Sequence, residues 1–165
     1  MKTDCMIFSF PSTPMDDLLV YSQKLRTIQE NISGSNDKLR IELCAHRAGY
    51  PGHLPDNPAL DKVDELLLQF EQQQIEIASL FVPLNLNKED QSLGEEISWV
   101  DGWTDLAAYA SISHIRLELR AFQYYTESIL TESFHEIVEY IKDMEIQASV
   151  ACSGGDDHLL LEFIQ

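Results

Sequence analysis

Two short segments alternate strictly between apolar and charged residues, and this period of two limits what they can form. In residues 38–45 aliphatic side chains occupy every second position, with Lys38, Arg40, Glu42 and then Cys44 at the positions between, and residues 115–120 alternate between aliphatic and charged side chains. Successive side chains of a strand point to opposite faces of a sheet, so each segment is predicted to be a strand with one buried face. The chain therefore needs other elements to cover an apolar sheet face.

Helix signals flank these strands. Pro14, followed by Asp16 in the first turn, predicts a helix that begins near residue 13 and ends at Gly34. Ser133 and Glu136 have the spacing of a capping box and predict the start of a later helix. Helices are therefore expected both before and after the central region of the sequence, packed on one face of the sheet.

A further helix is predicted from Asn57 and Pro58 to about Leu80, because apolar residues recur there at helical spacing. Residues 75–82 also alternate in part, so an extended conformation stays open for them. Cys5 to Phe10 reads as a short apolar strand that ends at Pro11.

Hairpin signals appear in the second half of the chain. Asp101-Gly102 lies between two apolar runs and predicts a hairpin within residues 97–104. Residues 153–157 have turn composition and separate predicted strands at 148–152 and 158–164. The expected fold class is α+β: a single acidic domain over residues 1–165, with a mixed or mainly antiparallel sheet and about three helices packed on it.

The charge is strongly negative and unevenly placed. The chain has 11 Lys and Arg against 28 Asp and Glu, a net charge of −17. Residues 61–111 hold 11 acids and 2 bases, and residues 127–165 hold 9 acids and 1 base, whereas residues 112–126 are the one net positive segment. Such a field repels nucleic acid phosphates and anionic membranes but attracts a basic protein.

Aromatic and acidic residues cluster within the acidic segments, as at interfaces with basic partners. The predicted partner-binding residues are Glu95, Glu96, Trp99, Asp101, Trp103, Asp105, Glu127 and Glu132. On this basis the sequence favours a cytoplasmic protein that inhibits a basic protein, such as an immunity protein or antitoxin that neutralises a nuclease-type toxin by occluding its active or substrate-binding site. The alternative for the tryptophans, core packing, stays open.

A second function class rests on histidines around a Gly- and Pro-rich loop. His46 and His53 bracket this loop and Asp56 lies near its end, a combination that suits acid–base chemistry or ligation of a metal. His114 could join them if the fold brought it near. The alternative interpretation is therefore a small enzyme or a metal- or ligand-binding protein that uses His46, His53 and Asp56.

Other signals are negative. No phosphate-binding glycine motif and no serine-hydrolase motif occurs, and no cofactor is expected. The three cysteines are widely spaced, which favours free thiols in a reducing cytoplasm over a disulfide framework. The first ten residues lack the long apolar run of a signal or membrane segment, so a cytoplasmic location without direct nucleic acid or membrane binding is expected.

Overall fold

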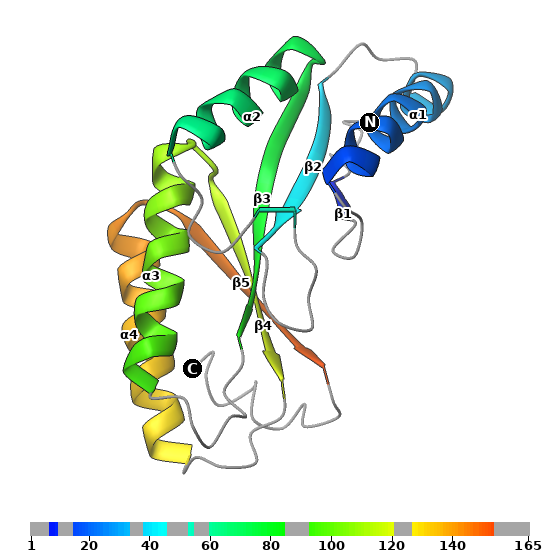
Figure 1. Cartoon of the computed structure of the whole chain (residues 1–165). Helices are drawn as coiled ribbons and strands as arrows, with labels where there is room; N and C mark the ends of the chain where they lie inside the picture. Colours follow the sequence, from blue (N-terminus) through cyan, green and yellow to red (C-terminus); the bar gives the residue numbers. More distant parts are fainter. Residues whose placement is uncertain are drawn as a thin grey trace. The chain divides into compact units, whose positions relative to one another are not determined.

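Strands and helices alternate along the described part of the chain (Figure 1). The computed structural model describes residues 7–9, 15–33, 38–45, 53–54, 60–84, 93–120 and 127–153. The strands are β1 (Phe8–Ser9), β2 (Leu39–Cys44), β3 (Ile75–Leu84), β4 (His114–Arg120) and β5 (Gln147–Ser153). The helices are α1 (Met15–Ser33), α2 (Leu60–Gln72), α3 (Leu93–Tyr109) and α4 (Glu127–Asp143).

The five described strands form one parallel sheet in which they are hydrogen-bonded in the order β1-β2-β3-β4-β5. Phe8 pairs with Ile41 at one end of the order, and His114 pairs with Gln147 at the other. A helix follows each of the first four strands and returns the chain to the edge where the next strand begins, which makes neighbours parallel. The predicted α+β class with a mixed or antiparallel sheet and about three helices is therefore wrong: over the described residues the fold is α/β, with a parallel sheet and four helices.

The predicted hairpin is wrong because Asp101-Gly102 lies inside α3. Val100, Trp103 and Ala107 are all buried, and their spacing is that of one helix face. Gly102 is exposed, and a Cβ added there would have no atom within 4 Å, so neither a turn nor a close contact requires glycine. The helical period of the flanking residues thus outweighs the local turn signal.

Two other boundaries differ from expectation. Helix α4 begins at Glu127, so Ser133 and Glu136 lie within it and do not cap its start. Helix α2 ends at Gln72, and Ile75–Leu84 is the strand β3, so the extended alternative for residues 75–82 is confirmed. The predicted strands at 38–45 and 115–120 are confirmed as β2 and β4. The predicted turn after Ser153 and the strand at 158–164 lie outside the described residues.

Three of the helices end in the same way. Gln74, Ser111 and Glu145 each follow a helix with a positive φ, of 56°, 56° and 59°. Ser111 N–H donates to Ala108 O at 3.1 Å, and the next N–H, of Ile112, donates to Ala107 O at 2.8 Å. This is the Schellman arrangement, and α4 repeats it at Glu145 and Ile146. Each end turns the chain sharply into the following strand.

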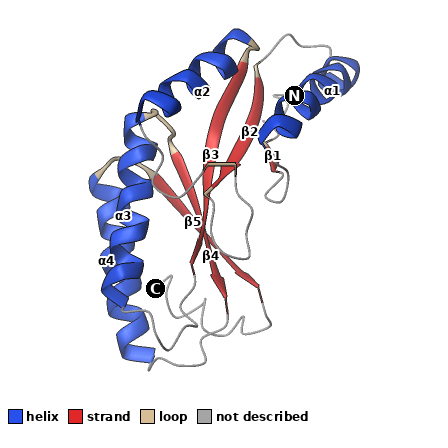
Figure 2. Cartoon of the chain, viewed as in Figure 1, coloured by secondary structure: helices blue, strands red, loops and turns tan. Residues whose placement is uncertain are grey.

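Contacts divide the chain into two compact units, Met1–Leu80 and Phe81–Gln165, with the division inside β3. In the first unit, the apolar side chains of β2 are buried together with Val63 and Phe70 of α2. In the second, α3 and α4 lie side by side, α3 packs on β4 and α4 on β5 (Figure 2). Ile115 and Leu117 of β4 are fully buried. None of the helices within the described residues has both the length and the apolar character needed to cross a bilayer.

Candidate functional site

The carboxyl ends of parallel strands share one edge of a sheet, and ligands of α/β proteins bind in the loops beyond that edge. In the first unit, β2 is followed by the Gly- and Pro-rich stretch of sequence that begins after Ala45. The polar side chains of β1, β2 and β3 near this edge are therefore the first place to look for a site.

Glu42 of β2 carries a buried carboxylate in this region, with 5% of the residue exposed. Ser9, its register partner on β1, donates its hydroxyl to Oε1. Ser79 of β3 donates its hydroxyl to Oε2 at 3.2 Å. Burial of a carboxylate is costly unless its oxygens are hydrogen-bonded, and both oxygens of Glu42 are satisfied by serines from neighbouring strands. We call Ser9, Glu42 and Ser79 the Glu42 cluster.

An ion pair lies beside the Glu42 cluster, and its arginine stands two residues before Glu42 on β2. Arg40 Nε donates to Glu76 Oε1 at 2.8 Å, and the two side chains are 28% and 44% exposed. A pair with this exposure is screened by water and contributes about 1 kcal/mol or less to stability. It ties β2 to β3 without burying either charge.

His53 lies at the end of β2, where the chain folds back onto Cys44. Its backbone N–H donates to Cys44 O at 2.8 Å, and its Nδ1 accepts from the Cys44 N–H at 2.9 Å. A bridge between Ala45 and Leu54 extends this contact. His53 is 6% exposed. Because Nδ1 accepts a hydrogen bond, the proton of the neutral ring sits on Nε2, so Nε2 is the donor nitrogen of the ring.

The structure therefore describes only one of the three residues of the histidine prediction. His53 is hydrogen-bonded to Cys44, which lies two residues after Glu42 on β2. His46 and Asp56 lie outside the described residues. Among the described side chains, no three His, Cys, Asp or Glu residues come together in a group that could hold a metal ion. The described donors therefore do not make a metal centre.

Sequence analysis missed the Glu42 cluster. The alternation of residues 38–45 assigned Glu42 to the solvated face together with Arg40, because both are charged. The two serines gave no signal, since a hydroxyl becomes informative only when a strand from elsewhere in the chain brings it beside a carboxylate. A carboxylate on a strand whose other residues, apart from Arg40, are apolar was the one available hint.

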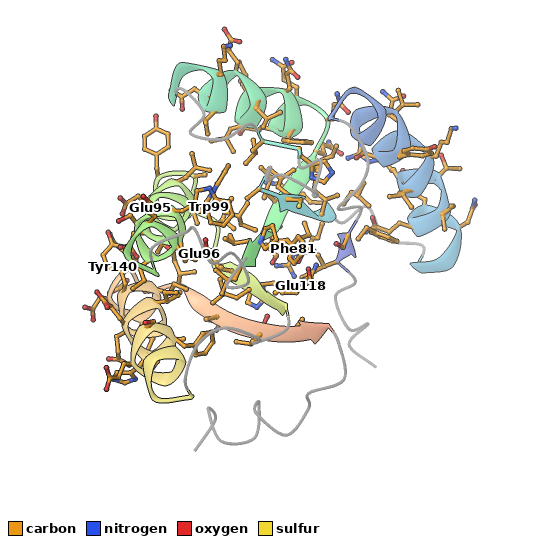
Figure 3. All side chains as sticks on the ribbon, turned by 60° about the horizontal axis from the view of Figure 1, so that its bottom comes forward. Phe81, Glu95, Glu96, Trp99, Glu118 and Tyr140 are labelled. Carbon is orange, nitrogen blue, oxygen red and sulfur yellow. The ribbon has the colours of Figure 1, made fainter. Side chains whose placement is uncertain are left out.

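The predicted partner-binding residues lie on α3 and α4. Figure 3 shows Glu95, Glu96 and Trp99 on α3, and Tyr140 on α4. Glu96 and Trp103 are buried, with 2% and 3% exposed, and Trp99 packs edge-on against Trp103 with ring centroids 6.0 Å apart. The exposed members of the set are Glu95, Asp105 and Glu132. Asp101 is half-buried, and Glu127 is the first residue of α4.

A polar contact joins the two helices. Tyr140 donates its hydroxyl to Asp105 Oδ1 at 2.7 Å, and this bond, with desolvation and the negative charges nearby, raises the pKa of Tyr140 to about 12. One turn earlier on α3, desolvation first, then Glu136 and Asp105, raise the pKa of Asp101 above its ordinary value of 3.8. The acids of these helices therefore repel one another within the protein.

Comparison with protein-family models gives no match, and no curated protein matches the chain. Solved structures do match. A xylose isomerase domain protein from Planctomyces limnophilus has a TM-score of 0.57 and 13% identity, over 76% of this chain and 48% of that one. A sugar phosphate isomerase/epimerase from Parabacteroides distasonis has a TM-score of 0.58 and 10% identity, over 98% of this chain and 63% of that one.

A third structure, the IolI protein with a bound zinc atom, has a TM-score of 0.51 and 12% identity, over 96% of this chain and 59% of that one. This chain thus spans between about half and just under two-thirds of the length of these three solved chains. The inhibitor interpretation, including the immunity protein and antitoxin, is contradicted, because the fold is shared with a xylose isomerase domain protein and a sugar phosphate isomerase/epimerase, neither of which is an inhibitor of that kind. Net charge had been the main support for an inhibitor, and charge alone identifies no function. The chain has a TIM-barrel-like α/β fold.

Proposed function

We propose that this protein is an enzyme that acts on a small polyhydroxylated molecule, with Glu42 as its acid–base group. The observation that carries the proposal is the Glu42 cluster: a buried carboxylate held by two serine hydroxyls near the carboxyl edge of a parallel sheet. In TIM-barrel enzymes catalytic residues come from the ends of several strands at this edge. Two of the similar structures, a xylose isomerase domain protein and a sugar phosphate isomerase/epimerase, support a sugar-like substrate.

The proposed reaction class is isomerisation or epimerisation of a hydroxy-carbonyl compound. Both reactions begin when a base removes the proton from the carbon next to the carbonyl, and both end when a proton returns to carbon. In an isomerisation Glu42 would take the proton from one carbon and return it to the neighbouring carbon, while the substrate's hydroxyl proton moves to the former carbonyl oxygen. In an epimerisation Glu42 would take the proton, and a proton from water would reach the opposite face of the same carbon. His53 would donate its Nε2 proton in a hydrogen bond to the substrate's carbonyl oxygen, in keeping with the tautomer set by Cys44.

Ser9 and Ser79 would position the carboxylate rather than react. Each fixes one oxygen of Glu42 from a different strand, so the orientation of the carboxyl plane depends on both. A serine-to-alanine change should therefore lower the rate without removing it. Zinc is bound by the IolI protein, but the described residues of this chain form no three-ligand group, and no step here is assigned to a metal.

The test is proton exchange in deuterated water. The protein would be incubated with a panel of aldoses, ketoses and their phosphates, and loss of the C1 and C2 proton signals would be followed by NMR. We expect exchange with at least one sugar, and a loss of about 100-fold or more in Glu42→Gln, the range that removal of an acid–base group produces. Ser79→Ala should give a smaller loss.

Glu76→Gln is the matched control, because Glu76 is a carboxylate on a neighbouring strand that pairs with Arg40 and, unlike Glu42, is only half-buried. It should exchange protons at the wild-type rate. Circular dichroism would show that both variants keep their helices. Equal rates for Glu42→Gln and the wild type, or no exchange with any sugar of the panel, would rule the proposal out.

A further inference from the structure

The second unit carries a positively charged strand in a strongly acidic region. Residues 81–165 contain 16 acidic and 4 basic residues, and two of the bases, Arg116 and Arg120, belong to β4. The other two are Lys88 and Lys142. Half of the basic residues of this unit thus lie on one inner strand of the sheet.

Arg116 is held in place by an aromatic ring. Its guanidinium carbon lies 4.1 Å from the centroid of the Phe81 ring on β3, and Phe81 is buried with 3% exposed. Stacking on a ring uses the flat face of the guanidinium and none of its five N–H donors, which point outward in the plane. The ring thus orients the guanidinium for hydrogen bonding in its plane.

Arg116 lies on the face of the sheet that α3 and α4 do not cover. Ile115 and Leu117, its neighbours in β4, are fully buried under the helices, and strand alternation places Arg116 and Glu118 together on the opposite face. Arg116 and Glu118 are both half-buried. Figure 3 shows Phe81 and Glu118 on adjacent strands.

The strand on the other side adds a hydroxyl. Ser149 of β5 is the register partner of Arg116 and is half-buried. Paired residues of parallel strands point to the same face, about 4.8 Å apart. A guanidinium, a hydroxyl and, about 6.6 Å further along β4, a carboxylate are thus presented together. Phe81, Arg116, Glu118 and Ser149 are called the Arg116 face below.

We propose that the Arg116 face binds a small ligand that carries an oxyanion next to a hydroxyl group. Arg116 and Ser149 donate hydrogen bonds to the oxyanion, and Glu118 accepts one from the ligand's hydroxyl. A guanidinium fork matches the geometry of a carboxylate or a phosphate. This site is built from the second unit alone and requires nothing of the Glu42 cluster, so the two proposals can fail separately.

Calorimetric titration tests the Arg116 face with three probes: inorganic phosphate, gluconate and, as the neutral comparison, glucose. We expect phosphate or gluconate to bind at least tenfold more tightly than glucose. A preference for phosphate identifies a phosphorylated ligand, and a preference for gluconate identifies a hydroxycarboxylate. Failure of both anions to bind more tightly than glucose overturns the proposal.

The variants separate this site from general charge effects. Arg116→Gln should weaken anion binding at least tenfold, and Phe81→Leu should weaken it severalfold because the guanidinium loses its orienting ring. Arg40→Gln removes an arginine of the first unit that pairs with Glu76 and should leave anion binding unchanged. Equal losses in Arg40→Gln and Arg116→Gln would overturn the site, as would an unchanged affinity in Arg116→Gln.

A conservative variant covers the case in which Arg116→Gln does not fold. Arg116→Lys keeps the positive charge but loses the planar fork, so it should bind the anion with intermediate affinity. Wild-type affinity in Arg116→Lys would overturn recognition by the fork. Proton exchange of a neutral sugar should continue in every Arg116 variant, whereas Glu42→Gln should retain anion binding.

Discussion

Asp101 is a residue whose ionised form the folded protein disfavours. Partial burial, and then the charges of Glu136 and Asp105, raise the pKa of its carboxyl group above 3.8. One oxygen of Asp101, Oδ1, is buried without a hydrogen-bond partner. Asp101 thus lowers stability at neutral pH.

We therefore expect Asp101→Asn to stabilise the protein by roughly 0.3–1 kcal/mol at pH 7, a range that allows for screening by solvent. A raised pKa means that the folded state holds the proton more tightly, so wild-type stability falls as pH rises from about 3.8 through the folded-state pKa. The variant should lose this part of the pH dependence. Urea unfolding across pH 4–7 measures both effects.

Glu132→Gln is the control for Asp101→Asn, because it removes the same charge from an exposed position on α4. Exposed substitutions change stability by about 0.5 kcal/mol or less. A pH dependence that is unchanged in Asp101→Asn, or a gain no larger than that of Glu132→Gln, would contradict the explanation.

Single-residue environments were the part of the site least accessible to sequence analysis. Charge placed Glu42 on a solvated face, and only the positions of Ser9 and Ser79 on adjacent strands show that its carboxylate is buried and satisfied. His53 was identified from its residue type and loop. Its partner, the backbone N–H of Cys44, has no sequence signature, because every residue except proline carries such a group.

Helix ends are a feature of the elements, and three of them place a residue with a side chain in a conformation that favours glycine. Ser111 and Glu145 have φ near +60° and are exposed, as is Gln74. A residue other than glycine in this conformation costs about 1–2 kcal/mol of folding free energy. Glycine avoids that strain, but its greater freedom in the unfolded chain cancels part of the gain. The protein accepts this cost at each of three helix-to-strand connections.

Ser111→Gly and Glu145→Gly should each stabilise the protein by about 0.5–1 kcal/mol, because the strain is relieved and no buried contact is lost. The two positions end different helices, so the gains should add in the double variant. Chemical unfolding monitored by circular dichroism measures these differences. Ala108→Gly, at an exposed position of α3, should instead cost about 1 kcal/mol. Destabilisation by Ser111→Gly would contradict the assigned cap geometry.

Elements with strong periodicity were predicted well, and their connections were not. The alternation of apolar and charged residues was sufficient to predict β2 and β4 as strands, because each has one apolar face. The end of α2 was missed because Gln74 stands where a glycine would have signalled the helix end. At Asp101-Gly102 the error was the opposite one: a turn was predicted where the helix α3 continues. Gly102 is exposed there and has no special conformational role.

At the scale of the whole molecule, the acidic excess sets how stability responds to salt. With 28 acids and 11 bases, repulsion among like charges opposes folding, and mobile ions reduce that repulsion. We expect the melting temperature to rise by several degrees between about 10 mM and 150 mM NaCl, across which the Debye length falls from about 30 Å to about 8 Å. Differential scanning calorimetry measures the change. A melting temperature that falls over this range would show that favourable ion pairs outweigh the repulsion.

The sheet's parallel order could not be predicted, because sequence periodicity reveals faces but not partners. A strand shows the same alternation whether its neighbours are parallel or antiparallel, so β2 and β4 gave no information on strand direction. The hairpin predicted at Asp101-Gly102 then favoured antiparallel pairing, but these residues lie in α3. Charge misled in a similar way at the level of function. An acidic surface is compatible with an inhibitor, an enzyme or a protein selected for solubility, so net charge alone does not choose among these functions.

The consecutive strand order also bears on how the chain assembles during synthesis. Phe8 pairs with Ile41, and His114 with Gln147, so in both cases the partners are separated by 33 residues. Each strand that leaves the ribosome after β1 therefore meets a neighbour that has already emerged, with one helix between them to close a short loop. Nascent chains could add one strand and one helix at a time, and no early strand waits for a late partner while its hydrogen-bonding edge is exposed to other chains.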